Sequence, residues 1–155
     1  MTIKRITAVS LSVIIALSAM IIFVGCMRTP EYKADDITAV ALSCGSGSTE
    51  QNYSFSLVKV KSKWYLTAEC FIEKSRKNIS IENVPIDETD AGEVTSIIES
   101  KNLIELSDKQ TASDEKPNYR FLLRFSDGKS RYTSTPIDDA VKQEFYRLAE
   151  KYGMK

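Results

Sequence analysis

The stretch from Tyr119 to Ser134, YRFLLRFSDGKSRYTS, decides the fold of this chain. Its first half places aromatic and leucine side chains at every second position, which is the period of a β-strand with one buried face. The dipeptide Asp127-Gly128 follows, and it favours the tight turn that joins two antiparallel strands. The stretch therefore predicts a β-hairpin whose return strand runs from Lys129 to Ser134.

Strand-like segments continue upstream of this hairpin, separated by polar turns. We expect them at Ile37–Cys44, Tyr53–Val60 and Trp64–Ile72, with a short fourth strand around Ile79 and Ile81. In the second segment the alternation shifts phase at Val58 and Val60, which predicts either a bulge or a strand covered on both faces.

Two segments place apolar residues at helical spacing. The first follows Asp90-Ala91-Gly92-Glu93, which resembles a capping box, and the second follows Thr135-Pro136 and ends at Gly153. The order of strands and helices predicts one α+β domain over residues 37–155, with an antiparallel sheet of about five to six strands and two helices packed on one face.

Composition excludes several classes of protein. The 155 residues contain 21 basic and 21 acidic side chains and no histidine. The missing histidine excludes Ser-His-Asp catalysis and histidine-ligated metal sites, and we expect neither a metal nor a cofactor. Without the first 25 residues, 19 basic and 21 acidic side chains remain, so the chain lacks the basic excess that nucleic-acid binding requires.

The N-terminus has the features of an export signal. Lys4 and Arg5 precede the 19 uncharged residues 6–24, and Phe23-Val24-Gly25-Cys26 ends this run. This segment resembles a bacterial lipoprotein precursor with its lipobox. The resemblance implies that residues 1–25 form a hydrophobic signal helix that is cleaved, and that Cys26 carries a diacylglycerol. Residues 26–36 then form a polar stalk, and the domain is tethered at the outer face of the bacterial cytoplasmic membrane.

Two other interpretations of the N-terminus remain open. A run of 19 uncharged residues approaches the roughly 20 that span a bilayer, so residues 6–24 also fit a single uncleaved transmembrane anchor. Simple secretion after cleavage is the third interpretation. Both membrane-bound interpretations place the folded domain on the same side of the membrane.

Lipid on Cys26 leaves Cys44 and Cys70 as an even pair in an oxidising compartment. A disulfide between them requires the first and third strands to be neighbours. In simple meander order the two residues lie about two strand spacings of 4.8 Å apart, beyond the roughly 4.4–6.8 Å that a disulfide tolerates. The alternative is two buried thiols.

Catalytic patterns are incomplete. Ser-x-x-Lys occurs at Ser113–Lys116 and at Ser126–Lys129, without the further motifs of serine acyl-enzymes. Acidic side chains gather at residues 87–90 and 138–139, where we interpret them as helix-capping acids. Metal binding is not expected at either cluster, because the spacing of a calcium loop is absent.

A basic face is predicted on the hairpin. Arg120 and Arg124 alternate with the apolar side chains of one strand, Arg131 lies on the other, and we expect all three on the outward face of the sheet near Tyr65. Such a face suits anionic headgroups, an anionic polymer of the cell wall or an acidic envelope protein. A solvated face that discourages edge aggregation is the simpler interpretation.

Three functions follow from these features. The first is a membrane-anchored, extracytoplasmic lipoprotein that acts as a non-catalytic binding or interaction module. The second is a small envelope hydrolase that uses carboxylates or a Ser-Lys pair. The third is an inhibitor or sequestering protein for an extracellular enzyme, which binds through an aromatic patch around Trp64 and Tyr65.

Overall fold

The computed structural model describes residues 31–45, 52–106 and 118–153. A compact unit begins at Tyr32. Its described residues form a six-stranded antiparallel sheet and two α-helices, so the predicted α+β class is confirmed. The predicted signal helix and Cys26 lie outside the described residues. The elements are η1 (Ala34–Asp36), β1 (Ile37–Gly45), β2 (Tyr53–Val60), β3 (Lys63–Ile72), β4 (Lys77–Ile86), α2 (Glu88–Ser100), η2 (Leu103–Glu105), β5 (Asn118–Phe125), β6 (Ser130–Thr133) and α3 (Asp139–Gly153).

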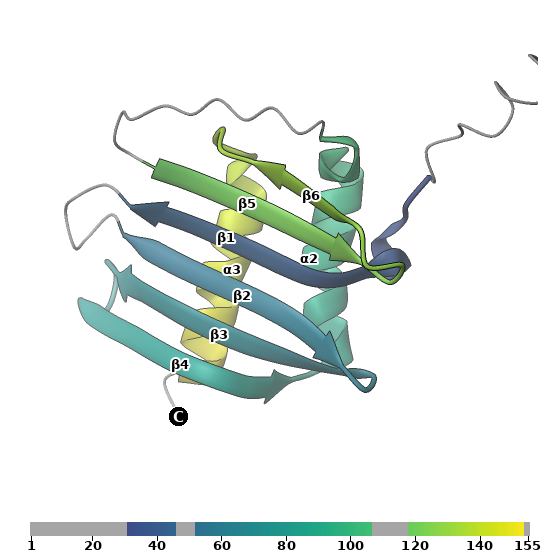
Figure 1. The fold of residues 1–155 in the computed structure, drawn as a ribbon. Helices are drawn as coiled ribbons and strands as arrows, with labels where there is room; N and C mark the ends of the chain where they lie inside the picture. The colour runs from purple at the N-terminus through teal and green to yellow at the C-terminus, as the bar shows by residue number, and fades with distance from the viewer. Residues whose placement is uncertain (1–30, 46–51, 107–117, 154–155) are drawn as a thin grey trace, which may run out of the picture. The chain divides into compact units, whose positions relative to one another are not determined.

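The strand order is β4-β3-β2-β1-β5-β6 (Figure 1). Strands β1 to β4 form a meander, because each pairs with its predecessor in the chain. The hairpin predicted from Asp127-Gly128 is β5–β6, and it joins the sheet on the free side of β1. Strands β1 and β2 are therefore the two central strands.

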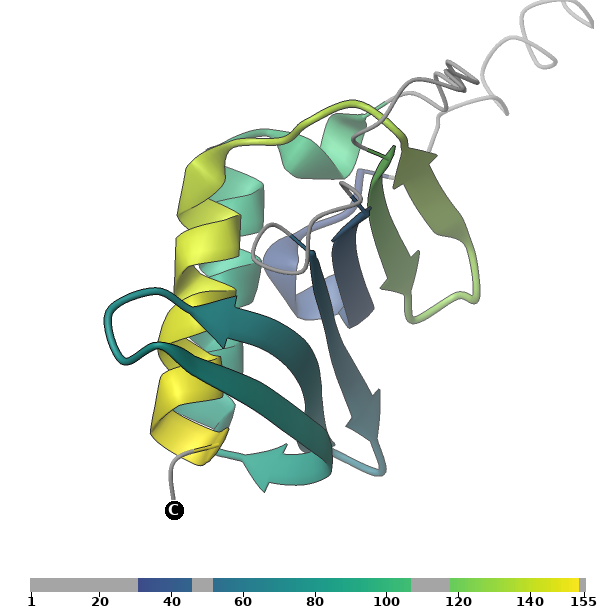
Figure 2. The same cartoon turned by 90° about the vertical axis from the view of Figure 1, so that its left-hand side faces the viewer.

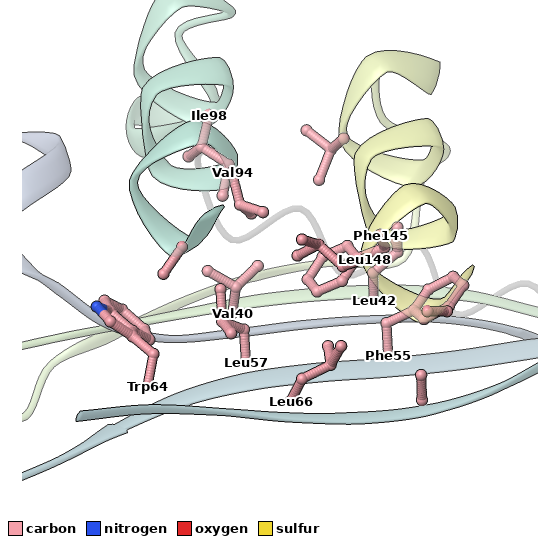
Figure 3. Close-up of a cluster of buried hydrophobic side chains, with 14 of the residues drawn as sticks. Val40, Leu42, Phe55, Leu57, Trp64, Leu66, Val94, Ile98, Phe145 and Leu148 are labelled. Atoms are coloured by element: carbon pink, nitrogen blue, oxygen red, sulfur yellow. The ribbon is translucent and has the colours of Figure 1, made fainter. Parts of the chain in front are cut away.

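Both helices cover the same face of the sheet (Figures 1 and 2). Strand side chains that point toward them are buried, which follows from the two-residue period of a strand. Figure 3 shows these side chains meeting the apolar faces of α2 and α3. The contacts of the core join Val40, Leu42, Phe55, Leu57, Trp64 and Leu66 of the sheet with Val94, Ile98, Phe145 and Leu148 of the helices.

Both helix starts differ from the prediction. Helix α2 begins at Glu88, two residues before the expected cap Asp90. Helix α3 begins at Asp139, so Thr135 and Pro136 lie before the helix, and Asp138 accepts the hydrogen bond from the Ala140 backbone N–H at 2.9 Å. Asp138 thus caps α3 as an acid, as its cluster was expected to do.

The end of α3 has a packing role that the sequence did not indicate. Gly153 is the last residue of the helix, and a Cβ atom there would lie 2.6 Å from Ile79 Cγ2 on β4. The glycine therefore allows the helix end to approach the sheet closely.

The phase shift at Val58 and Val60 has a different cause from the two predicted. Strand β2 pairs without interruption, and both valines lie on the face away from the helices, where they are 37% and 49% exposed. Register irregularities lie elsewhere in the sheet. One is in β4, where Asn83 adopts a positive φ of 52° and donates its backbone N–H to Thr67 Oγ1, and another is in β1 between Ile37 and Ala39.

Part of the predicted polar stalk is packed on the domain. Tyr32 stacks on Phe125 with ring centroids 3.8 Å apart, and its hydroxyl donates a hydrogen bond to Asp127 at 2.8 Å. The Ser126 backbone N–H donates to the Asp36 carbonyl at 2.8 Å. The compact unit thus starts at Tyr32 rather than at Ile37.

Candidate functional site

The strongest candidate surface is the sheet face opposite the helices, which we call the open face. No helix of the described residues covers it (Figure 2). Cross-strand partners point to the same side of a sheet, so the strand register assigns its residues in rows. One row runs Glu69, Ser54, Ser43 and Arg120, the next Thr67, Ser56, Ala41, Leu122 and Tyr132, and the third Tyr65, Val58, Ala39 and Arg124.

The register brings three of the four predicted face residues together. Arg120, Arg124 and Tyr65 all lie on the open face, with both arginines exposed and Tyr65 half-buried. Tyr65 and Arg124 occupy the same row, separated by β2 and β1.

Arg131 is not part of this face. It pairs with Leu123, which is buried in the core, so its side chain lies on the helix-covered side of the edge strand β6. The length of the turn determines which residues face each other in a hairpin, and the sequence did not define that length. The prediction therefore placed Arg131 on the wrong face. Here Arg124 pairs with Ser130, which puts Ser130 rather than Arg131 on the open face.

The open face carries charges of both signs. Glu69 on β3 is exposed at the end of the row that ends in Arg120 on β5. Within the described part of the chain, the structure gives Glu69, Arg120 and Arg124 no ion-pair partner. The alternation of the third strand already puts Glu69 on the same face as Tyr65, but sequence reasoning left it out of the candidate site. It missed the outward valines, for which the phase shift at Val58 and Val60 was the signal.

Trp64 and Tyr65 do not form a common patch. Trp64 is 5% exposed in the core, with the Lys59 ammonium 5.5 Å from its ring centroid. Tyr65 is the next residue of the same strand and therefore points to the open face.

Cys44 and Cys70 are free and buried. They lie on β1 and β3, and both are opposite Tyr53 on the intervening strand β2. This is the meander order, in which two strand spacings of about 4.8 Å separate the cysteines. Burial raises the pKa of the Cys70 thiol to about 11 and also raises that of Cys44, so both remain protonated at neutral pH.

Two hollows lie near the ends of the strands. One is lined by Cys44, Tyr53, Glu69, Cys70 and neighbouring residues, and the other lies between β5 and the start of α3. Among the described residues that line them, each has one carboxylate, Glu69 in the first hollow and Asp139 in the second. Glycoside hydrolysis requires a pair of carboxylates across the scissile bond, so neither hollow supplies that arrangement.

The most buried acid among the described residues joins the two helices. Asp90 on α2 is 5% exposed and accepts hydrogen bonds from Arg147, Lys151 and Tyr152 of α3, at 2.9, 2.5 and 2.5 Å. Burial raises the pKa of Asp90, but the three donors outweigh it and bring the pKa down to about 2. The interpretation of Asp90 as a helix cap is therefore wrong; it is the acceptor of an interhelical ion pair.

Of the two Ser-Lys patterns, only the one at Ser126 and Lys129 lies within the described residues. Ser113 and Lys116 lie outside the described residues. Ser126 and Lys129 flank the exposed β5–β6 turn, where the Lys129 ammonium lies 3.7 Å from Asp127 Oδ2. Among the described residues, no group of three potential ligand side chains could hold a metal ion.

The strand edges are poor docking sites. Strand β4 carries the irregularity at Asn83 and Pro85 in its second half, and β6 spans only four residues. Proteins use such features to keep sheet edges from pairing with other chains. The open face is the extended surface that remains.

No protein-family model, curated protein or solved structure matches this chain. Within the described ranges, no helix is long and apolar enough to cross a membrane.

Proposed function

We propose that this chain is a lipid-anchored, non-catalytic interaction module that binds a protein partner through the open face of its sheet. Cys26 carries the lipid, and the domain stands at the outer face of the bacterial cytoplasmic membrane. The open face is the observation that carries this proposal: it is uncovered by the described helices and combines charged, aromatic and apolar side chains.

The charge pattern favours a protein over an anionic polymer or anionic headgroups. Polyanion binding requires a field of one sign, and Arg131 does not contribute to this face. Glu69 adds a negative charge at the end of the row that contains Arg120. Charges of both signs around apolar side chains are typical of a surface that recognises another folded protein.

The few residues between the lipidated cysteine and the compact unit make the tether short. Five residues separate Cys26 from Tyr32, the first residue of the compact unit. At roughly 3.3–3.6 Å per residue, a fully extended tether holds Tyr32 within about 20 Å of the lipidated residue. A partner of this module is therefore a protein at the membrane surface.

The two alternatives have less support. For a hydrolase, Asp90 serves interhelical pairing and Asp138 caps α3, and the described lining of each hollow contains a single carboxylate. For an inhibitor that uses an aromatic patch, Trp64 is buried and only Tyr65 is available on the open face.

The proposal is tested in a bacterial host that expresses the full chain. A photo-reactive phenylalanine replaces Val58 on the open face, and the control position is Gln143, which is exposed on α3. We expect a protein adduct from position 58 and none from position 143. Adducts from position 143 alone, or lipid or polymer adducts from position 58, would overturn the proposal.

The anchor has its own test. Mass spectrometry of the membrane-bound protein should find a diacylated Cys26 as the mature N-terminus. Cys26→Ser should prevent lipidation, so that the chain is either released from the membrane or remains as the uncleaved precursor. In the wild type, a mature N-terminus without lipid, or a chain that retains residues 1–25, contradicts the lipid anchor.

A further inference from the structure

In the two rows that contain Arg120 and Arg124, the cations of the open face lie on one side of its centre and the groups that attract cations lie on the other. Lys63, the partner of the outward Val60, is a further cation on β3 outside these rows. Arg120 and Arg124 lie on β5, on one side of the two central strands, and Glu69 and Tyr65 lie on β3, on the other side. Arg120 shares a row with Glu69, and Arg124 shares a row with Tyr65. These two rows therefore carry a cationic group on β5 and a group that attracts a cation on β3, whereas the middle row from Thr67 to Tyr132 carries no charge.

This division makes the face complementary to itself. A two-fold axis that runs parallel to the strands, midway between β1 and β2, places β5 of one copy over β3 of the other. Positions along the strands do not change in this rotation, so each row meets its own copy. Arg120 then faces Glu69 of the second copy, and Arg124 faces the Tyr65 ring of the second copy, and each contact occurs twice.

The centre of the face fits close contact between two sheets. The outward side chains of β1 and β2 meet there, with Ala41 over Ser56 of the second copy and Val58 over Ala39. Packed sheets lie about 10 Å apart with their strands nearly aligned, and short side chains at the centre allow this separation. The exposed Val58 would lose its contact with water there.

The other face-to-face arrangement is unfavourable. A two-fold axis perpendicular to the strands places the row of Arg120 over the row of Arg124, which sets like charges against each other. It also places the two Tyr32 residues at opposite ends of the dimer. The axis parallel to the strands keeps both at one end, as two chains tethered to one membrane require.

We propose that the protein partner of the open face is a second copy of this chain, in a face-to-face dimer whose axis runs parallel to the strands. This inference rests on the proposed function, because it names the partner of the same surface. The shared tether raises the effective concentration of the second copy, so a moderate intrinsic affinity is sufficient.

The test combines photo-crosslinking with a charge exchange. The full lipidated chain carries the photo-reactive residue at position 58, and its adducts in membranes are identified by mass. Arg120→Glu and Glu69→Arg are made singly and together; both residues are exposed. The matched controls are Lys77→Glu and Glu105→Arg, which change the same charges away from the open face.

We expect a covalent homodimer from the chain that carries only the photo-reactive residue, which serves as the wild-type reference, and from both controls. Each single exchange sets like charges against each other at two contacts and should lower the dimer yield about tenfold or more. The double exchange re-forms both pairs with reversed polarity and should restore the yield to within about threefold of the wild type.

The outcomes separate this inference from the proposed function. Single exchanges without effect, or a double exchange that does not restore the dimer, overturn the dimer geometry. An adduct with a different protein at position 58 overturns the homodimer and leaves the open face as a docking surface. The absence of any protein adduct overturns both.

Discussion

The hydroxyl of Tyr152 on α3 donates a hydrogen bond to the Asp90 carboxylate on α2 over 2.5 Å. Arg147 and Lys151 donate to the same carboxylate from successive turns of α3. One buried acid thus fixes the relative position of the two helices that form the closed side of the domain. It also gives Asp90, in the first turn of α2, a structural role.

Removal of this carboxylate should destabilise the domain. We expect Asp90→Asn to lower the free energy of unfolding by about 1–3 kcal/mol, because it weakens charge-assisted hydrogen bonds to a buried acceptor. Urea unfolding followed by circular dichroism measures this change. Glu93→Gln is the control: the Glu93 side chain is 53% exposed and pairs with Arg147 only, so its loss should cost less than about 1 kcal/mol.

The same carboxylate predicts an acid-dependent loss of stability. The pKa of Asp90 is about 2 in the folded chain against 3.8 as the ordinary value, so the folded state favours the charged form. The resulting stabilisation, about 2 kcal/mol, is complete above about pH 4 and is lost as the pH falls toward 2. The difference in free energy of unfolding between wild type and Asp90→Asn should therefore be smaller at pH 2.5 than at pH 6. An equal difference at both pH values contradicts the assignment.

Gly153 should tolerate no larger side chain. We expect Gly153→Ala to lower the free energy of unfolding by about 1–3 kcal/mol, because the new methyl group overlaps Ile79 Cγ2. Gly92→Ala offers a matched control inside α2, where a Cβ meets nothing within 4 Å. That substitution should stabilise by roughly 0.5–1 kcal/mol, since alanine favours a helix over glycine. Measured by thermal unfolding, Gly153→Ala should lower the Tm and Gly92→Ala should raise it.

Tyr32 should belong to the folded domain rather than to a free stalk. Tyr32→Ala removes the stacking on Phe125 and should lower the free energy of unfolding by about 1–2 kcal/mol. Tyr32→Phe keeps the ring and loses only an exposed hydrogen bond to Asp127, so its stability should stay within about 0.5 kcal/mol of the wild type. Chemical denaturation of both variants decides the point, and equal stability of Tyr32→Ala and wild type would show that the segment is not anchored.

Cys44 and Cys70 should remain thiols. Two strand spacings separate them, and Tyr53 lies between them in the register. We expect both to resist alkylation in the native protein and to react fully in denaturant without a reducing agent. Mass spectrometry of the alkylated chain counts the modified thiols, and a chain that reacts only after reduction contains the disulfide.

Local features of the structure were predictable from the sequence by itself. The two-residue alternation in β3 and β5 identified which side chains enter the core, and Asp127-Gly128 located the hairpin turn. The apolar residues at helical spacing before Gly153 include Val141, Phe145 and Leu148, and α3 buries all three. These properties depend on periods and turn preferences within about ten residues, so the amino-acid order alone determines them.

Only the tertiary structure decided how distant segments meet. The position of β5 beside β1 set the rows of the open face, and the pairing of Arg131 with Leu123 turned that arginine away from it. The contact of Asp90 with Tyr152 joins residues 62 positions apart, and no local pattern indicates it. Strand order, register and helix pairing depend on which long-range arrangement buries the apolar faces of all the elements at once. For this protein, that choice decided the candidate site, whereas the sequence determined the elements from which it is built.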